Sequence, residues 1–172
     1  RWDGEPVKLI TARGADRASR YTQALKAYAD VESDPKAAAD NINKDLKFLV
    51  ARATAGQALA GAGKLEDARA KLEAFLQVGA TSFRYFDAVG LLGRVELAAG
   101  SHDKAKAQFT ALAGAPWLDY KMAGQSAQAR VLLAQGNVDG ALSAFQAVIT
   151  QGGNNPDKAI KGQRFQAVLG KS

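Results

Sequence analysis

The sequence has no cysteine and a single histidine among its 172 residues. Without cysteine the chain cannot form disulfide bonds or thiolate metal sites. With no cysteine or second histidine to join it, His102 is expected to be a solvated turn residue rather than a metal ligand or a catalytic base. No apolar run reaches the length of a membrane span, and no signal peptide opens the chain. We therefore expect no cofactor, no bound metal and no membrane span.

The chain is also poor in aromatic residues, which make up 8% of it although 47% of its residues are hydrophobic. The apolar content is therefore carried largely by alanine, which favours helix strongly. The length is sufficient for one domain with a sizeable core. Because the chain begins with Arg1 rather than Met, we expect a processed protein or an excised domain, and its compartment stays open. The alanine- and glycine-rich composition favours a bacterial source.

One short pattern occurs three times along the chain. Each copy consists of Gly, two further residues, an acid, one residue and Ala, with a large apolar residue four positions after the Ala. The copies begin at Gly63, Gly100 and Gly136, so they lie 37 and 36 positions apart. A constant period of this size is typical of stacked supersecondary units.

Each of these glycines is flanked by apolar residues at steps of three and four, which predicts a pair of amphipathic helices. The glycine is expected to end the first helix, because a residue without Cβ enters the left-handed conformation at little cost. Ser101 and Asn137 are predicted to be N-caps of the second helix. The other positions recur by type, with acids in the first turn, alanines where the two helices approach closely, and large residues that fill the space between them. The acids are Glu66, Asp103 and Asp139. The alanines are Ala68, Ala105 and Ala141, and the large residues are Leu72, Phe109 and Phe145.

The hairpins resemble the tetratricopeptide repeat family, whose units combine a small residue in the first helix with an alanine and an aromatic residue in the second. Leu92 and Gly93 match the Leu-Gly pair of that pattern, and Gly56 and Ala129 occupy the same place in the flanking units. The further matches are Ala105 with Phe109, Ala141 with Phe145, Pro116 and Pro156. The resemblance covers about residues 40–150. Glu96 and Gln128 depart from the pattern, and the period exceeds the family's usual length of about 34 residues.

This resemblance implies an all-α fold, a right-handed superhelical solenoid of antiparallel helix pairs whose first helices line a concave face. The repeat domain is expected at residues 16–156, with a lone helix at 16–34 and hairpins at about 40–78, 82–113 and 117–151. An irregular lead-in at 1–15 precedes it, and the helix from about residue 40 should be the longest. A capping helix at 157–172 is expected to cover the end of the stack with its apolar side and to turn its basic side to water. The covering residues would be Ala159, Ile160, Phe165, Val168 and Leu169, and the water-facing residues Lys158, Lys161 and Arg164.

The resemblance also implies a non-catalytic scaffold that binds a protein or peptide in its concave groove. Carried over residue by residue, the groove positions are Gln57, Arg94 and Arg130, and Asp87 and Ser126 lie one to two turns earlier on the helices of the two arginines. Two guanidinium groups in register would hold a carboxylate through bidentate hydrogen bonds. The alternative is that each arginine pairs with an acid of its own array, such as Asp87 or Glu96.

Other functions fit fewer residues. The repeated acids sit in separate units and cannot share a substrate atom, and Gly61–Lys64 lacks the Ser or Thr that follows in a phosphate loop, so we do not expect an enzyme. The net charge of +6, from 23 basic and 17 acidic residues, leaves RNA binding as a weaker alternative. The basic residues are scattered, and no aromatic residues recur at groove positions. A structural spacer or self-association module is the stronger competitor.

Overall fold

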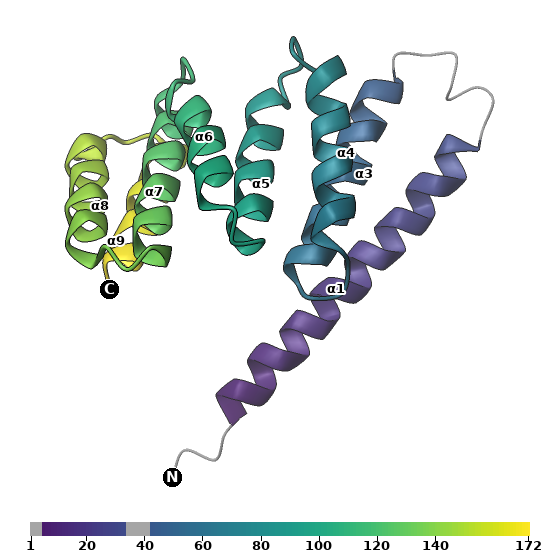
Figure 1. The fold of residues 1–172 in the computed structure, drawn as a ribbon, viewed down its shortest axis with the longest axis horizontal. Coiled ribbons are helices and arrows are strands. Elements are labelled where there is room, and N and C mark those ends of the chain that lie inside the picture. The colour runs from purple at the N-terminus through teal and green to yellow at the C-terminus, as the bar shows by residue number, and fades with distance from the viewer. Residues whose placement is uncertain (1–4, 34–41) are drawn as a thin grey trace. The chain divides into compact units, whose positions relative to one another are not determined.

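Helices are the regular secondary structure of the residues that the structure, a computed structural model, describes, which are 5–33 and 42–172 (Figure 1). This confirms the predicted all-α class. The chain divides into two compact units, Arg1–Leu91 and Leu92–Ser172, so the boundary falls within the helix that spans Tyr85–Ala98. The helices are α1 (Glu5–Glu32), α3 (Ile42–Leu59), α4 (Leu65–Val78), α5 (Tyr85–Ala98), α6 (His102–Ala113), α7 (Leu118–Ala134), α8 (Val138–Gly152) and α9 (Lys158–Lys171).

The predicted hairpins correspond to pairs of consecutive helices. The segments 40–78, 82–113 and 117–151 contain α3 with α4, α5 with α6, and α7 with α8, and the predicted cap at 157–172 is α9. The start that was expected for the first hairpin, at about residue 40, lies outside the described residues. The acids Glu66, Asp103 and Asp139 all fall in the first turn of the second helix of a pair, where a carboxylate interacts favourably with the helix dipole.

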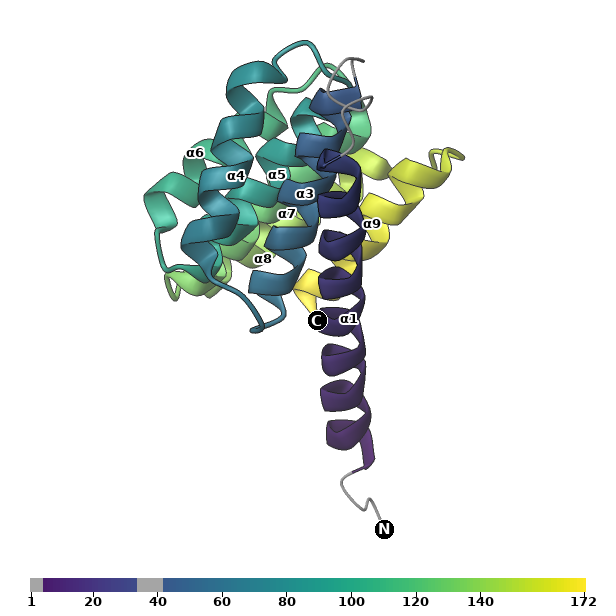
Figure 2. The ribbon, with the colours of Figure 1, turned by 90° about the vertical axis from the view of Figure 1, so that its right-hand side faces the viewer.

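In the first unit, α3 packs against both α1 and α4 (Figure 2). The rings of Phe48 on α3 and Phe75 on α4 lie 5.3 Å apart between centroids and are tilted by 56°. Toward α1, Gly56 lies directly against the ring of Tyr21, so that a Cβ at this position would come within 2.6 Å of the ring. Leu72 and Ala68 of α4 are completely buried, as the repeat pattern predicts.

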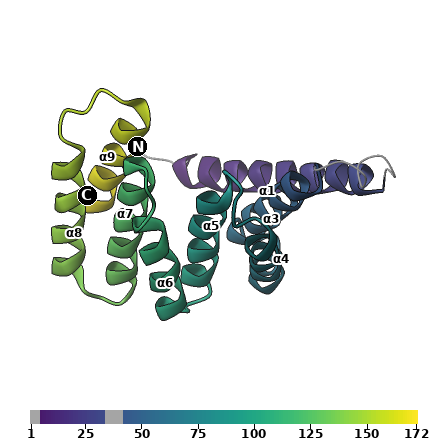
Figure 3. The same ribbon diagram turned by 90° about the horizontal axis from the view of Figure 1, so that it is seen from above.

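In the second unit, α6, α7, α8 and α9 pack in succession, and α9 also contacts α7 (Figure 3). Phe109 and Phe145, the predicted large residues of the repeat, are almost wholly buried. A Cβ on Gly93 of α5 would lie 2.7 Å from Cδ1 of Phe109, and a Cβ on Gly124 of α7 would lie 2.8 Å from the Cα of Ala113 on α6. The close approach of these helices therefore depends on glycines, which have no side chain.

Left-handed glycines end the first helix of each pair, although not always where the repeat predicts them. Gly100 and Gly136 have φ angles of +73° and +80°, as expected. In the first pair Gly61, with φ +78°, has this role, so the prediction for Gly63 is wrong. The reason is that α3 ends at Leu59, and in all three pairs the glycine lies two residues after the last helical residue.

The predicted N-caps differ from each other. The Oδ1 atom of Asn137 accepts a hydrogen bond of 3.0 Å from the backbone N–H of Gly140, which confirms this cap. Ser101 occupies the N-cap position of α6, as predicted, but its side chain makes no capping hydrogen bond. At α9, Asp157 caps the helix by accepting from the N–H groups of Ala159 and Ile160.

The prediction for the start of the chain is wrong. Residues 5–15 were expected to be irregular, yet α1 runs from Glu5 to Glu32 and, at 28 residues, exceeds the 18 residues of α3. Pro6, which suggested a turn, lies in the first turn of this helix, where its missing N–H has no intrahelical partner to lose. The predicted helix end before Asp34 agrees with the observed end at Glu32.

The capping helix covers the stack with fewer residues than predicted. Ala167 is completely buried and Ile160 packs against the core of Met122, Phe145 and Val148. Phe165, Val168 and Leu169, which were expected to cover the stack, are 60%, 42% and 53% exposed. The buried face of α9 is thus narrower than its apolar content suggests.

Two glycines in helices of the second unit provide a matched test of this packing. We expect Gly124→Ala to lower the free energy of unfolding by roughly 1–3 kcal/mol, because the new Cβ would overlap the backbone of Ala113. Gly162→Ala on α9 should instead raise it by up to about 1 kcal/mol, because a Cβ there meets no neighbour and alanine favours helix. Urea denaturation followed by circular dichroism measures both. Equal effects of the two substitutions would contradict the packing described here.

Candidate functional site

The five residues predicted to line a groove are distributed over both units. Gln57 and Asp87 belong to the first unit, whereas Arg94, Ser126 and Arg130 belong to the second. Each unit therefore has to be considered by itself.

In the first unit, both predicted residues contact neighbouring polar groups. The side-chain amide of Gln57 donates a hydrogen bond of 3.0 Å to the hydroxyl of Thr22 on α1. Asp87 lies 3.6 Å from Nη1 of Arg84, one turn earlier. That guanidinium also stacks over two rings, 4.5 Å from the centroid of Phe83 and 5.4 Å from that of Phe48. Gln57 and Asp87 thus interact with residues of the first unit. The repeat pattern did not predict the aromatic contacts of Arg84.

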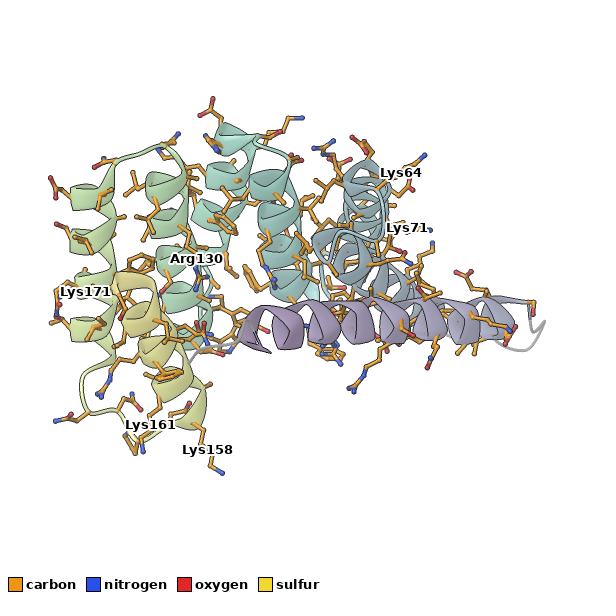
Figure 4. The ribbon with its side chains drawn as sticks, turned by 90° about the horizontal axis from the view of Figure 1, so that it is seen from below. Lys64, Lys71, Arg130, Lys158, Lys161 and Lys171 are labelled. Atoms are coloured by element: carbon orange, nitrogen blue, oxygen red, sulfur yellow. The ribbon has the colours of Figure 1, made fainter. Side chains whose placement is uncertain are left out.

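In the second unit, Arg94 and Arg130 occupy equivalent positions. Each lies four residues before the last residue of its helix, α5 or α7. The same parts of these helices contribute to one apolar cluster, in which Leu97 of α5 packs against Ala105 and Phe109 of α6 and Ala127 and Val131 of α7. Both arginines are solvent-exposed at the margin of this cluster (Figure 4 shows Arg130 extending from α7). The packing that buries Phe109 thereby fixes where the two guanidinium groups emerge.

The two arginines influence each other electrostatically. The pKa of Arg130 is lowered, first because the surrounding protein displaces water from its guanidinium and second because the positive charge of Arg94 is near. Within residues 92–172 the side chain of neither arginine forms a hydrogen bond or an ion pair. The alternative that each is neutralised by an acid of its own array is therefore not seen inside this unit. Two adjacent cations without a counter-charge form a site suited to an anion.

Ser126 has a different environment from the arginines. It lies one turn before Arg130 on the same side of α7, but it is only 2% exposed, and its Oγ makes no hydrogen bond. The Oε1 atom of Gln125, the preceding residue, is also buried without a partner. Burial of polar atoms without hydrogen bonds costs free energy. The hydroxyl of Ser126 is thus buried without a hydrogen bond, so this side chain is not displayed on the surface as predicted for a groove residue. The periodicity of the sequence did not indicate that the Oε1 atom of Gln125 would be buried as well.

Neither a metal-binding cluster nor a membrane-spanning helix is found in the part of the chain that the structure describes. No group of three or more histidine, aspartate or glutamate side chains is arranged to hold a metal ion there. None of the helices in these residues combines the length and the apolar character that a membrane span requires. The arginine pair is a cluster on which a ligand can be argued from charge.

Replacing Arg130 tests whether the pair is repulsive. We expect Arg130→Gln to leave the free energy of unfolding unchanged or to raise it by a few tenths of a kcal/mol, because the substitution removes like-charge repulsion. Urea denaturation at low and high salt measures this, and the difference should shrink as salt screens the charges. Lys106→Gln, at an exposed position of α6, serves as the control. A loss of more than about 1 kcal/mol in Arg130→Gln would instead show that this arginine makes a stabilising contact.

Comparison with known proteins adds no assignment to this geometry. No protein-family model matches the chain, and no curated protein or solved structure is significantly similar to it.

Proposed function

We propose that the chain is a non-catalytic scaffold that binds a carboxylate-bearing segment of a protein or peptide through Arg94 and Arg130. The observation that carries this proposal is the pair itself, two exposed guanidinium groups at equivalent positions of α5 and α7, close enough to lower a pKa and without a counter-charge in their unit.

The chemistry of the pair favours a carboxylate ligand. A guanidinium group presents its N–H donors as a planar fork that matches the two oxygens of a carboxylate. A bound carboxylate would also offset the repulsion between Arg94 and Arg130, which contributes to the lowered pKa of Arg130. Either a C-terminal carboxylate or an Asp or Glu side chain meets this requirement.

The repeated hairpins support the scaffold part of the proposal. Three helix pairs of similar length follow one another, and Ala68, Ala105 and Ala141 are all completely buried. We propose that these are tetratricopeptide-like units that continue as a solenoid, with first helices on the concave side. Such arrays have no need of a catalytic centre, because their extended inner surface binds partners.

The main competing function is a spacer or self-association module without a peptide ligand. The repeats alone fit it equally well, since stacked hairpins need no ligand to be stable. A spacer function gives no reason, however, why Arg94 and Arg130 should occupy equivalent positions without an ion pair inside their unit. The arginine pair is therefore the feature on which the two functions can be separated.

The test is an array of immobilised peptides that vary in acidic side chains and in a free or amidated C-terminus. We expect binding to depend on a carboxylate, and Arg94→Ala combined with Arg130→Ala to weaken it by at least roughly tenfold, as expected for the loss of charge-assisted hydrogen bonds. Helicity by circular dichroism should be unchanged, because both side chains are exposed.

The control is Lys104→Ala combined with Lys106→Ala, which removes two exposed charges from α6. This variant should bind like the unmodified protein. If the arginine variant kept its affinity, the assignment of the pair would be wrong. If no carboxylate peptide bound and analytical ultracentrifugation showed self-association, the spacer or self-association module would be the better account.

A further inference from the structure

The last helix exposes an apolar surface that the rest of its unit does not use. Ala167 and Ile160 attach α9 to the core formed with α7 and α8. On the opposite side Phe165, Val168 and Leu169 are between 42% and 60% exposed. Their spacing of three and four residues places them on one face of the helix. Large apolar side chains that gather on one exposed face commonly mark an interaction site.

The same face is basic over its first two turns. Helix α9 contains Lys158, Lys161, Arg164 and Lys171 and no acidic residue. Arg164 donates to the carbonyl of Gly153, and the Nζ atom of Lys171 donates to Oε1 of Gln146. The side chains of Lys158 and Lys161 form no hydrogen bond or ion pair within residues 92–172, and Figure 4 shows both extending outward from the start of α9. This outer face of α9, formed by Lys158, Lys161, Phe165, Val168 and Leu169, therefore changes from basic to apolar along the helix.

The outer face also borders a depression in the surface. A hollow lies between the α8–α9 loop and α9, lined by Asn154, Asn155, Lys161, Arg164, Phe165 and Val168. The hydrogen bond from Arg164 to Gly153 ties the helix to the loop on the other side of this hollow. Nearby, Gly162 lies within the helix, where a Cβ would meet nothing within 4 Å. A glycine inside a helix is unfavourable by up to about 1 kcal/mol relative to alanine, and no neighbour in the unit requires it.

We infer that the outer face of α9 binds an acidic amphipathic segment of a partner protein. Carboxylates of that segment pair with Lys158 and Lys161, and an apolar side chain that follows them enters the hollow beside Phe165 and Val168. Gly162 allows the partner's backbone to approach the helix closely. The surface is separate from Arg94 and Arg130, so the inference does not rest on the function proposed for that pair.

Charge and pattern favour this occupant over two others. A symmetric contact between two copies of the outer face would bring together two surfaces that both carry Lys158 and Lys161. The adjacent acid, the N-cap Asp157, has its carboxylate engaged by the N–H groups of Ala159 and Ile160. A helix that lies in a membrane interface has a large apolar side, whereas the exposed large apolar residues of α9 are confined to Phe165, Val168 and Leu169 in its second half. An acidic segment that becomes apolar along its length complements both halves of the face.

The experiment uses the full 172-residue chain and a fluorescein-labelled peptide with glutamates in its first half and leucine and phenylalanine in its second. Fluorescence anisotropy should show saturable binding that weakens as salt is raised. Lys158→Gln combined with Lys161→Gln, and separately Phe165→Ala, should each raise Kd roughly tenfold. Gly162→Ala should weaken binding although it stabilises the helix. These positions are exposed, so the variants are expected to fold.

Matched controls separate this surface from others. Lys104→Gln with Lys106→Gln, Val138→Ala at another exposed apolar position, and Arg94→Ala with Arg130→Ala should leave Kd unchanged. The inference is overturned if the peptide with glutamine in place of glutamate binds equally well, or if the α9 variants bind like the unmodified chain. It is also overturned if anionic vesicles bind through Phe165 and the peptide does not, or if Phe165→Ala abolishes a dimer while the peptide never binds.

Discussion

The close approach of helices at positions without a side chain is the constraint on which the rest of this structure depends. Tyr21 lies on Gly56, Phe109 on Gly93, and the backbone of Ala113 on Gly124. In each contact a backbone or a ring occupies the volume that a Cβ would need, so the helices cannot shift or rotate freely. Interiors packed to this density transmit the position of one helix to the next. Within each unit, these contacts help to fix which faces of the helices are exposed.

The candidate binding features are consequences of this packing. Because Phe109 is seated among Leu97, Ala127 and Val131, the same turns of α5 and α7 present Arg94 and Arg130 at the margin of the cluster. On α9, by contrast, the small residue Ala167 makes the buried contact and leaves the larger apolar residues outside. The surface at Arg94 and Arg130 is therefore defined by two positive charges. The outer face of α9 is defined by apolar side chains next to lysines. Both are exposed faces of helices whose opposite faces are fixed.

The extent to which the sequence predicts this structure depends on how local each signal is. The alanines and large residues of the repeat, such as Ala105 with Phe109, could be predicted because they contact each other within one hairpin. The helix over residues 5–15 could not, since Pro6 is compatible with both a turn and a first helical turn. The burial of Ser126 and the exposure of Phe165 depend on which face a neighbouring helix covers, and periodicity does not specify that choice. The repeat predicted that Arg94 and Arg130 occupy equivalent positions. That neither side chain forms an ion pair within its unit could be seen only in the structure.

The central claim is that packing through Gly93 and Phe109 brings Arg94 and Arg130, 36 positions apart, into each other's electrostatic range. Since the chain has no cysteine, Arg94→Cys and Arg130→Cys can be combined and labelled with pyrene at only these two positions. The account predicts excimer emission from the folded protein that disappears in urea, and monomer emission alone from either single variant. Monomer emission alone from the folded double variant, with helicity intact, would contradict it.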